Sequence, residues 1–140
     1  MNNLPKAELH CHLDGVLDPE MAQAIQQEHP EFPIDVQAFR RVYPLSRSME
    51  AFFQWFGHVG AAEAELEYFC WIAEQHIQRL KAQNVRYAEW LLPAGTFGLR
   101  QGVQQALERT HALRQHVDKH ENGQIQVEFV VGVGRNRPPG

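Results

Sequence analysis

Three short apolar segments, separated by long stretches with helical periodicity, constrain the fold of this chain most strongly. The strand-like segments span about 6–13, 85–92 and 125–133, and helices are predicted over about 61–83 and 99–120. Strands that alternate with helices in this way are typical of βαβ units, in which the strands run parallel. The sequence therefore predicts an α/β fold built on a parallel sheet.

Composition places the chain among ordinary globular proteins. Of its 140 residues 44% are apolar, and the net charge of -4 without a basic run argues against nucleic acid as a partner. The first residues lack the apolar core of a signal peptide, and no run is long enough to span a bilayer. Cys11 and Cys70 are too few for a disulfide framework and are expected to be buried thiols. We therefore expect one cytoplasmic domain over residues 1–140, with no membrane partner.

Residues 19–60 are expected to form a helical insertion after the first strand. Asp18 followed by Pro19 is typical of a helix start, because aspartate caps the first turn and proline suits the first helical position. This helix is expected over about 19–28, where the prolines that follow end it. A short helix is also predicted around 36–42.

Aromatic residues are dense at the end of this insertion. Ser48 is a plausible helix cap, and Met49, Phe52, Phe53 and Phe56 recur with the spacing of one helical face. From the residues alone, the favoured interpretation is a helix packed into the core.

The two later helices are amphipathic and are expected to cover the sheet. His76 lies next to the apolar stripe of the first, so a packed or rim position is expected for it. Three histidines fall on the polar or terminal part of the second and are expected to be solvated: His111, His116 and His120. In the last strand Val130 joins an otherwise polar face, which predicts a strand that becomes buried on both sides.

A pair of histidines at the end of the first strand is the main chemical signal. Strand side chains alternate between faces, so His10 and His12 should project to one side, and Leu9, Cys11 and Leu13 to the other. Two imidazoles on one side can bind a single metal ion. Asp14 follows where the chain leaves the sheet, and Gly15 allows a sharp turn or the close approach of a ligand.

The segment 6–15, Lys-Ala-Glu-Leu-His-Cys-His-Leu-Asp-Gly, resembles the opening signature of the adenosine deaminase family. Members of this family are metal-dependent purine deaminases of the amidohydrolase superfamily, built on a TIM-like (β/α)8 barrel. The resemblance implies one Zn²⁺ per active site, or another divalent metal, with His10 and His12 as two ligands. It also implies that Asp14 contacts the sugar hydroxyl of a nucleoside and that Gly15 lies at the substrate.

Two further segments bear on this resemblance. Family members carry a similar Phe-rich helix over the purine, which makes Phe52, Phe53 and Phe56 candidates for the pocket wall. The segment Tyr87-Ala88-Glu89 fits the family pattern on the second strand. Leu91 departs from it, because a polar or basic residue is expected there, and this weakens the case for adenosine itself as the substrate.

A full barrel needs about 250 residues, so the chain is expected to hold the N-terminal part, about three βα units. The chain ends soon after its last strand without a covering helix, as a truncated chain would. The resemblance implies hydrolytic deamination of adenosine or a related 6-aminopurine to inosine or hypoxanthine plus ammonia. The family's remaining ligands and proton-transfer groups lie on later strands, so no catalytic residue is expected in this chain, which is predicted to be inactive alone.

Other functions remain open at this point. Other metal-dependent hydrolases, of the amidohydrolase or polymerase-histidinol-phosphatase type, also use two histidines in this spacing, and the chain could be a non-catalytic binding or assembly module. The cytidine deaminase class is excluded, because it needs a His-x-Glu and a Pro-Cys-x-x-Cys segment. A three-stranded parallel sheet with free edges also predicts self-association of the chain, or a missing C-terminal portion.

Overall fold

A parallel three-stranded sheet with the order β1-β2-β3 forms the centre of the computed structural model. The strands are β1 (Lys6–His12), β2 (Val85–Pro93) and β3 (Gln126–Gly132). Their parallel arrangement confirms the α/β class expected from the sequence. The structure describes residues 4–43, 48–62, 65–93 and 102–132.

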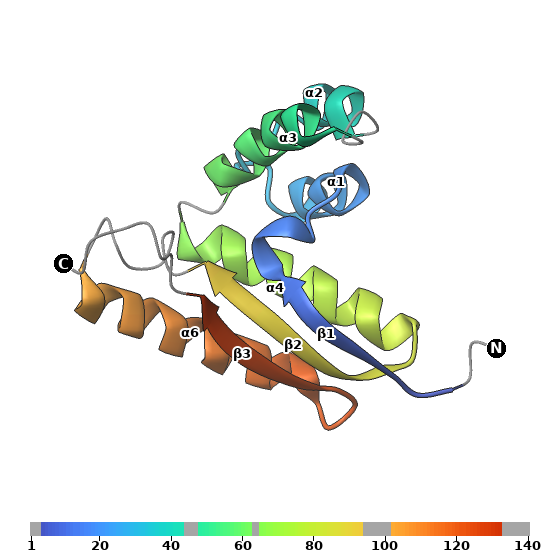
Figure 1. The fold of residues 1–140 in the computed structure, drawn as a ribbon, viewed down its shortest axis with the longest axis vertical. Coiled ribbons are helices and arrows are strands. Elements are labelled where there is room, and N and C mark those ends of the chain that lie inside the picture. The colour runs from blue at the N-terminus through green and yellow to red at the C-terminus, as the bar shows by residue number, and fades with distance from the viewer. Residues whose placement is uncertain (1–3, 44–47, 63–64, 94–101, 133–140) are drawn as a thin grey trace.

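Two long helices cover one face of this sheet, α4 (Leu66–Ala82) and α6 (Val103–Glu121) (Figure 1). Alternate residues of β2 point into the layer between sheet and helices. Ala88, Trp90 and Leu92 are fully or almost fully buried there, against apolar side chains of both helices. We call this the covered face of the sheet. Within the described residues, no helix has the length and apolarity needed to cross a membrane.

The opposite face, which we call the open face, has no helix over it among the described segments. The side chains of Tyr87, Glu89 and Leu91 on this face are partly exposed. The expectation that β3 becomes buried on both sides is wrong for the described residues, because Val130 is 43% exposed and Val131 57% exposed. Among the described strands β3 pairs only with β2, so its outer edge has no neighbouring strand.

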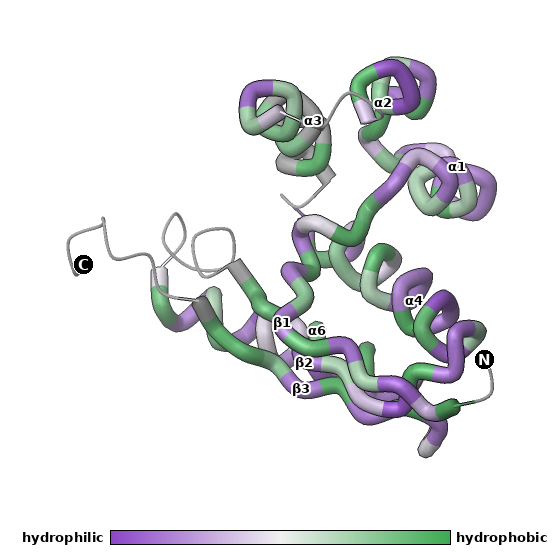
Figure 2. Tube along the Cα trace, turned by 45° about the vertical axis from the view of Figure 1, so that its right-hand side comes forward, coloured by the Kyte–Doolittle hydropathy of each residue, from purple (hydrophilic) through white to green (hydrophobic). Residues whose placement is uncertain are grey.

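The insertion forms three helices with a core of their own: α1 (Pro19–Glu28), α2 (Val36–Val42) and α3 (Met49–Ala62). Figure 2 shows these helices grouped away from the strands, with α4 between them and the sheet. Their buried side chains pack together with Ile72 of α4. The same helix therefore contributes to two cores, one on each side.

The helix boundaries differ from the sequence expectation at their amino ends. α3 continues to Ala62 and α4 begins only at Leu66, because Glu65 has an extended backbone with φ -105° and ψ 136°. Gly102 precedes α6 with φ +94°, a conformation that favours glycine, so α6 begins at Val103. Residues 63–64, 99–101 and 133, which the predicted segments include, lie outside the described residues.

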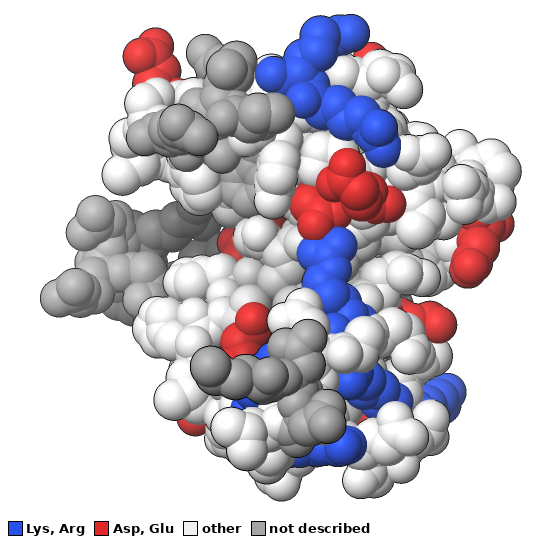
Figure 3. Space-filling view, turned by 90° about the vertical axis from the view of Figure 1, so that its right-hand side faces the viewer, with Lys and Arg blue, Asp and Glu red and all other residues white. Residues whose placement is uncertain are grey.

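Paired charges connect the insertion to the rest of the chain. Asp18 caps α1 as predicted, by accepting a hydrogen bond of 2.8 Å from the Met21 amide, and forms an ion pair of 2.7 Å with Arg79 of α4. Arg40 of α2 lies 3.9 Å from Glu20 of α1. Figure 3 shows acidic groups flanked by basic groups on the side of the molecule that it presents. Opposite charges thus alternate there rather than gathering into a patch of one sign.

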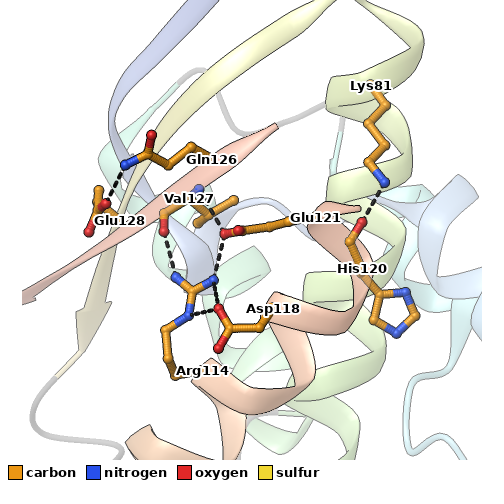
Figure 4. A network of polar contacts seen from close by, with 8 residues as sticks. All are labelled: Lys81, Arg114, Asp118, His120, Glu121, Gln126, Val127 and Glu128. Carbon is orange, nitrogen blue, oxygen red and sulfur yellow. Dashed lines mark hydrogen bonds and ion pairs between the residues drawn. The ribbon is translucent and has the colours of Figure 1, made fainter. Parts of the chain in front are cut away.

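A network around Arg114 attaches α6 to β3 (Figure 4). The guanidinium contacts the carboxylates of Asp118 and Glu121 and donates to the Val127 carbonyl, while the Val127 amide donates to Glu121. At the same end of α6, Lys81 of α4 donates a hydrogen bond to a backbone carbonyl, that of His120. The carboxyl end of α6 is therefore held by both α4 and β3.

The solvated state expected for the histidines of α6 holds for only one of them. His111 is exposed, whereas His116 and His120 are partly buried next to Glu74 of α4. The helical spacing put His116 and His120 on the polar or terminal part of α6, and it could not show that Glu74 of α4 lies against this part of the helix.

Candidate functional site

A bulge in β1 determines which side each of its residues faces. Pairing with β2 runs from Glu8–Ala88 directly to Cys11–Trp90, so β1 has one residue more than β2 over this interval. His10, inside the interval, has φ +59°, in the left-handed region that few side chains adopt. An extra residue reverses the alternation of side chains for the rest of the strand. The residues before and after the bulge must therefore be assigned to faces separately.

The bulge brings Glu8 and Cys11 to the same side, where both meet His76 of α4. The Glu8 carboxylate lies 3.1 Å from the His76 Nε2 atom, and the Cys11 Sγ atom 3.8 Å from it. This hydrogen bond lowers the pKa of Glu8 against the effect of burial. Burial and the nearby Glu8 raise the pKa of the Cys11 thiol to about 12, so it stays protonated.

Regular alternation predicts the faces of these residues only in part. Cys11 and Leu13 lie toward the core as expected, but Leu9 does not: it is 63% exposed because it falls in the bulge. His76 is buried, as a packed histidine should be. Its contact with Glu8 was missed, because unbroken alternation would put Glu8 on the side of His10 and His12. The sequence carries no local signal for the extra residue.

His10 and His12 lie close together at the carboxyl end of β1. Their ring centroids are 5.6 Å apart with the ring planes at 66°, and both side chains are exposed. Two imidazoles bound tetrahedrally to one ion, with metal–nitrogen distances of about 2.1 Å, have ring centres about 5 Å apart. The separation in the structure is thus compatible with a shared ion.

Asp14 lies beside this pair, in a single turn of 3-10 helix, η1 (Leu13–Gly15). Its side chain is buried, yet the Oδ1 atom has no hydrogen-bond partner among the described residues and lies 3.7 Å from the His12 Nδ1 atom. Burial raises the pKa of this carboxyl group. A buried carboxylate oxygen without a partner is costly, and Asp14 thus offers an acceptor to a group that the described segments do not supply.

Gly15 does not have the backbone conformation expected from its sequence position. It is absent from the described glycines with positive φ, and a Cβ atom built on it would meet the His12 Cβ atom at 3.8 Å, an ordinary contact. The sharp turn predicted here therefore does not require glycine. Close approach of a ligand to Gly15 stays a prediction.

The aromatic residues of α3 have unequal surroundings. α3 contacts η1, which brings the helix near the carboxyl end of β1. Phe56 is partly buried against the core of the insertion and stacks on Phe52 with centroids 5.6 Å apart. Phe53 is 62% exposed. The predicted core position is therefore right for Phe56, whereas Phe52 and Phe53 present aromatic surface.

The open face also carries polar groups from β2 and β3. The Tyr87 hydroxyl donates a hydrogen bond of 3.1 Å to the Glu89 carboxylate, and Glu89 is opposite Glu128 in the strand register. Within the described residues, two carboxylates thus lie side by side on this face, with the two histidines on the neighbouring strand.

Part of the chain is similar in sequence to curated adenine deaminases. No family model matches the chain. A curated relative, the adenine deaminase of Ectopseudomonas mendocina, is 34% identical over 91 residues, which are 64% of this chain and 29% of the relative. The chain thus spans less than a third of the length of the curated relatives it matches.

Solved structures share the fold at low sequence identity. The chain matches arabidopsis ADAL, solved in complex with GMP, with a TM-score of 0.69 and 18% identity, over 97% of this chain and 42% of that one. It matches an amidohydrolase from Burkholderia ambifaria with bound Zn with a TM-score of 0.59 and 21% identity, over 93% of this chain and 36% of that one. The sequence similarity to adenine deaminases and this shared fold fit a partial chain of the adenosine deaminase family.

Proposed function

We propose that this chain is the β1–β3 part of a zinc-dependent purine deaminase whose complete form is a (β/α)8 barrel. The observation that carries the proposal is the side-by-side placement of the His10 and His12 rings next to the buried Asp14 carboxylate, whose Oδ1 atom accepts no hydrogen bond from the described residues. The position also supports it, because barrel active sites lie at the carboxyl ends of the strands.

In this proposal, His10 and His12 are two of the ligands of one Zn²⁺ ion. Bound zinc lowers the pKa of a coordinated water to about 7 and so supplies a nucleophile at neutral pH. The zinc found in the Burkholderia ambifaria amidohydrolase, which has a similar fold, supports the choice of metal. Other divalent ions with affinity for imidazole are the alternative.

The strained backbone of His10 favours a functional role for its side chain. A non-glycine residue in the left-handed region costs on the order of 1 kcal/mol or more, and such residues occur often at active sites. Glycine would relieve the strain but would remove the imidazole. A histidine at this position is therefore best explained by what its ring binds.

We propose a 6-aminopurine as the substrate, converted by water to the 6-oxopurine and ammonia. The adenine deaminase relatives favour adenine, with hypoxanthine as product, over adenosine and inosine, and Leu91 agrees with that preference. The exposed rings of Phe52 and Phe53, with Phe56 beneath, would contribute apolar surface to the purine pocket. Asp14 and Gly15 would contact the substrate beside the metal.

The proposed catalytic set is incomplete in this chain. None of His76, His111, His116 or His120 lies at the carboxyl end of a described strand, so none can add a third ligand to the β1 pair. We therefore expect the 140-residue chain to bind zinc without deaminating a purine.

Zinc binding and ammonia release test these two statements separately. Calorimetric titration with zinc should show one site lost in the H10A/H12A variant and retained in the matched control H111A, which removes an exposed histidine of α6. Retention of that site in H10A/H12A would refute the metal site. Formation of hypoxanthine or inosine by the 140-residue chain at an enzymatic rate would refute its predicted inactivity.

The substrate class needs its own comparison. Any longer product of the same gene should release ammonia from adenine faster than from adenosine or AMP. Hydrolysis of amides or phosphate esters, with no deamination of adenine, adenosine or AMP, would favour the amidohydrolase or polymerase-histidinol-phosphatase alternative. Zinc binding with no hydrolysis of any of these would favour a non-catalytic module.

A further inference from the structure

A second group of metal-binding side chains lies between α4 and α6, away from the open face of the sheet. Glu74 of α4 faces His116 and His120, which are one helical turn apart on α6. The Glu74 Oε2 atom is 3.6 Å from the Nε2 atom of each histidine, and the two ring centroids are 4.6 Å apart. We call these residues the interhelical triad.

The spacing of the triad suits a small ion. Ligand atoms at about 2.1 Å from a tetrahedral metal are about 3.4 Å from one another, close to the separation of the Glu74 carboxylate from each imidazole. The three ligand atoms all lie within 4.8 Å of one another. Small side-chain adjustments would thus bring all three to one ion and leave a fourth position for water.

The His116 ring is already oriented to present a free nitrogen. Its Nε2 atom is buried and has no hydrogen-bond partner among the described residues. A buried polar atom without a partner costs free energy, and a bound ion would satisfy it.

The helices that carry the triad are fixed to each other near these residues. Lys81 of α4 donates a hydrogen bond to the carbonyl of His120, and Figure 4 shows this contact at the end of α6 held by Arg114. Binding would therefore require little rearrangement of the backbone. His120 and Glu74 are partly exposed, which gives an ion a route from solvent.

From this arrangement we propose that Glu74, His116 and His120 form a site for a divalent transition-metal ion such as Zn²⁺ or Co²⁺, distinct from the β1 pair. An ion bound there cross-links α4 and α6 on the outer side of the sheet. Glu8, Cys11 and His76 form another cluster of possible ligands. It is a weaker candidate, because its thiol is held protonated and its carboxylate is already bonded to the imidazole.

Cobalt provides a direct test, because tetrahedral Co²⁺ absorbs visible light much more strongly than octahedral Co²⁺. The purified chain is first changed to H10A/H12A, so that the β1 pair cannot contribute. Titration of this protein with CoCl₂ should still give one tetrahedral site. Changing His116 and His120 to Ala in that background should weaken Co²⁺ binding by about a hundredfold, or abolish it.

A conservative variant and a matched control keep the result interpretable. E74Q retains the size of the side chain but removes its charge, and should weaken binding by about tenfold. H111A removes an exposed histidine of the same helix and should leave binding unchanged. Circular dichroism checks that each variant is folded.

Two outcomes would overturn the proposal. One is the absence of a saturable Co²⁺ site in folded H10A/H12A protein. The other is binding that E74Q leaves unchanged and that H111A weakens as much as the loss of His116 and His120 does. Should the variants of the interhelical triad fail to fold, NMR of the histidine side chains of the unmodified chain replaces them. Zn²⁺ must shift the resonances of both His116 and His120, and unchanged resonances refute the site.

Discussion

The two faces of the sheet differ in how completely their side chains are buried. On the covered face, Ala88, Trp90 and Leu92 are enclosed by α4 and α6. On the open face the neighbouring residues of β2, Tyr87 and Leu91 among them, remain partly exposed. β2 thus contributes buried side chains to the core on one face and partly exposed side chains to the other face.

This contrast separates side chains that maintain the fold from side chains that need a partner. On the covered face the apolar side chains of β2 are buried against α4 and α6. The open face carries the two histidines of β1 and, at its rim, the unpartnered Asp14 oxygen. Changes to the covered face should therefore act on stability, and changes to the open face on binding and association.

The largest effect is expected from W90A. Trp90 is fully buried between the sheet and both helices, and loss of a buried Trp side chain costs about 3–5 kcal/mol. V130A is the matched change on the open face and should alter the free energy of unfolding by about 0.5 kcal/mol or less. Urea denaturation measures both, and equal losses in the two variants would contradict the contrast between the faces.

A smaller, pH-dependent loss is expected from D18N. Burial raises the pKa of Asp18, but hydrogen bonds from Arg79 and from the Met21 amide outweigh it, and the net pKa is lowered. Asparagine keeps the helix cap, so the variant removes only the charge. A lowered carboxyl pKa stabilises the fold above the unfolded pKa of about 3.9, and this stabilisation is lost as pH falls through the folded pKa.

Urea denaturation at two pH values checks this sign. At neutral pH D18N should be less stable than the parent chain by about 1 kcal/mol, a modest value because Arg79 is partly exposed. The difference should shrink as the pH falls below the unfolded pKa of the aspartate and through its lower folded pKa. A difference that is independent of pH would mean that the charge of Asp18 does not stabilise the link between α1 and α4.

The backbone conformation in the bulge predicts that the H10G variant is more stable than the H10A variant. His10 has φ +59°, which glycine adopts without strain and alanine does not. H10G should therefore be more stable than H10A by about 1 kcal/mol, although both variants lose the same imidazole. Thermal and urea unfolding compare the two, and equal stability would show that the left-handed backbone of His10 carries no strain.

The smallest effect on stability is expected from V130K, which acts on association. Val130 is exposed on the outer described strand of the sheet, and lysine on such a strand opposes pairing between chains. Light scattering should show self-association of the parent chain and less of it in V130K, with the free energy of unfolding unchanged within about 0.5 kcal/mol. A monomeric parent chain would refute the predicted self-association.

Local signals in the sequence were sufficient for most of the fold. The apolar spacing marked the strands and the two covering helices, and Asp18 followed by Pro19 marked the start of α1. The closeness of His10 and His12 agrees with the expectation from their spacing, although His10 lies in the bulge, where regular alternation does not hold.

Features that depend on contacts between distant segments could not be predicted in this way. The bulge arises from the register of β1 against β2, and it alone turns Glu8 toward His76. Similarly, His116 and His120 were expected in solvent, because the spacing of α6 does not reveal that Glu74 of another helix faces them. Both errors concern which partner a polar side chain meets.

The extra residue in β1 determines which face of the sheet each side chain of this strand occupies. Deletion of Leu9 would give β1 and β2 equal numbers of residues over this interval and restore unbroken pairing. Glu8 and Cys11 would then stay on the covered face and His10 and His12 on the open face. A protein engineer who transplants residues 8–12 into another sheet must therefore carry the bulge along or delete one residue, since unbroken alternation of the full segment would put Glu8 on the side of the two imidazoles.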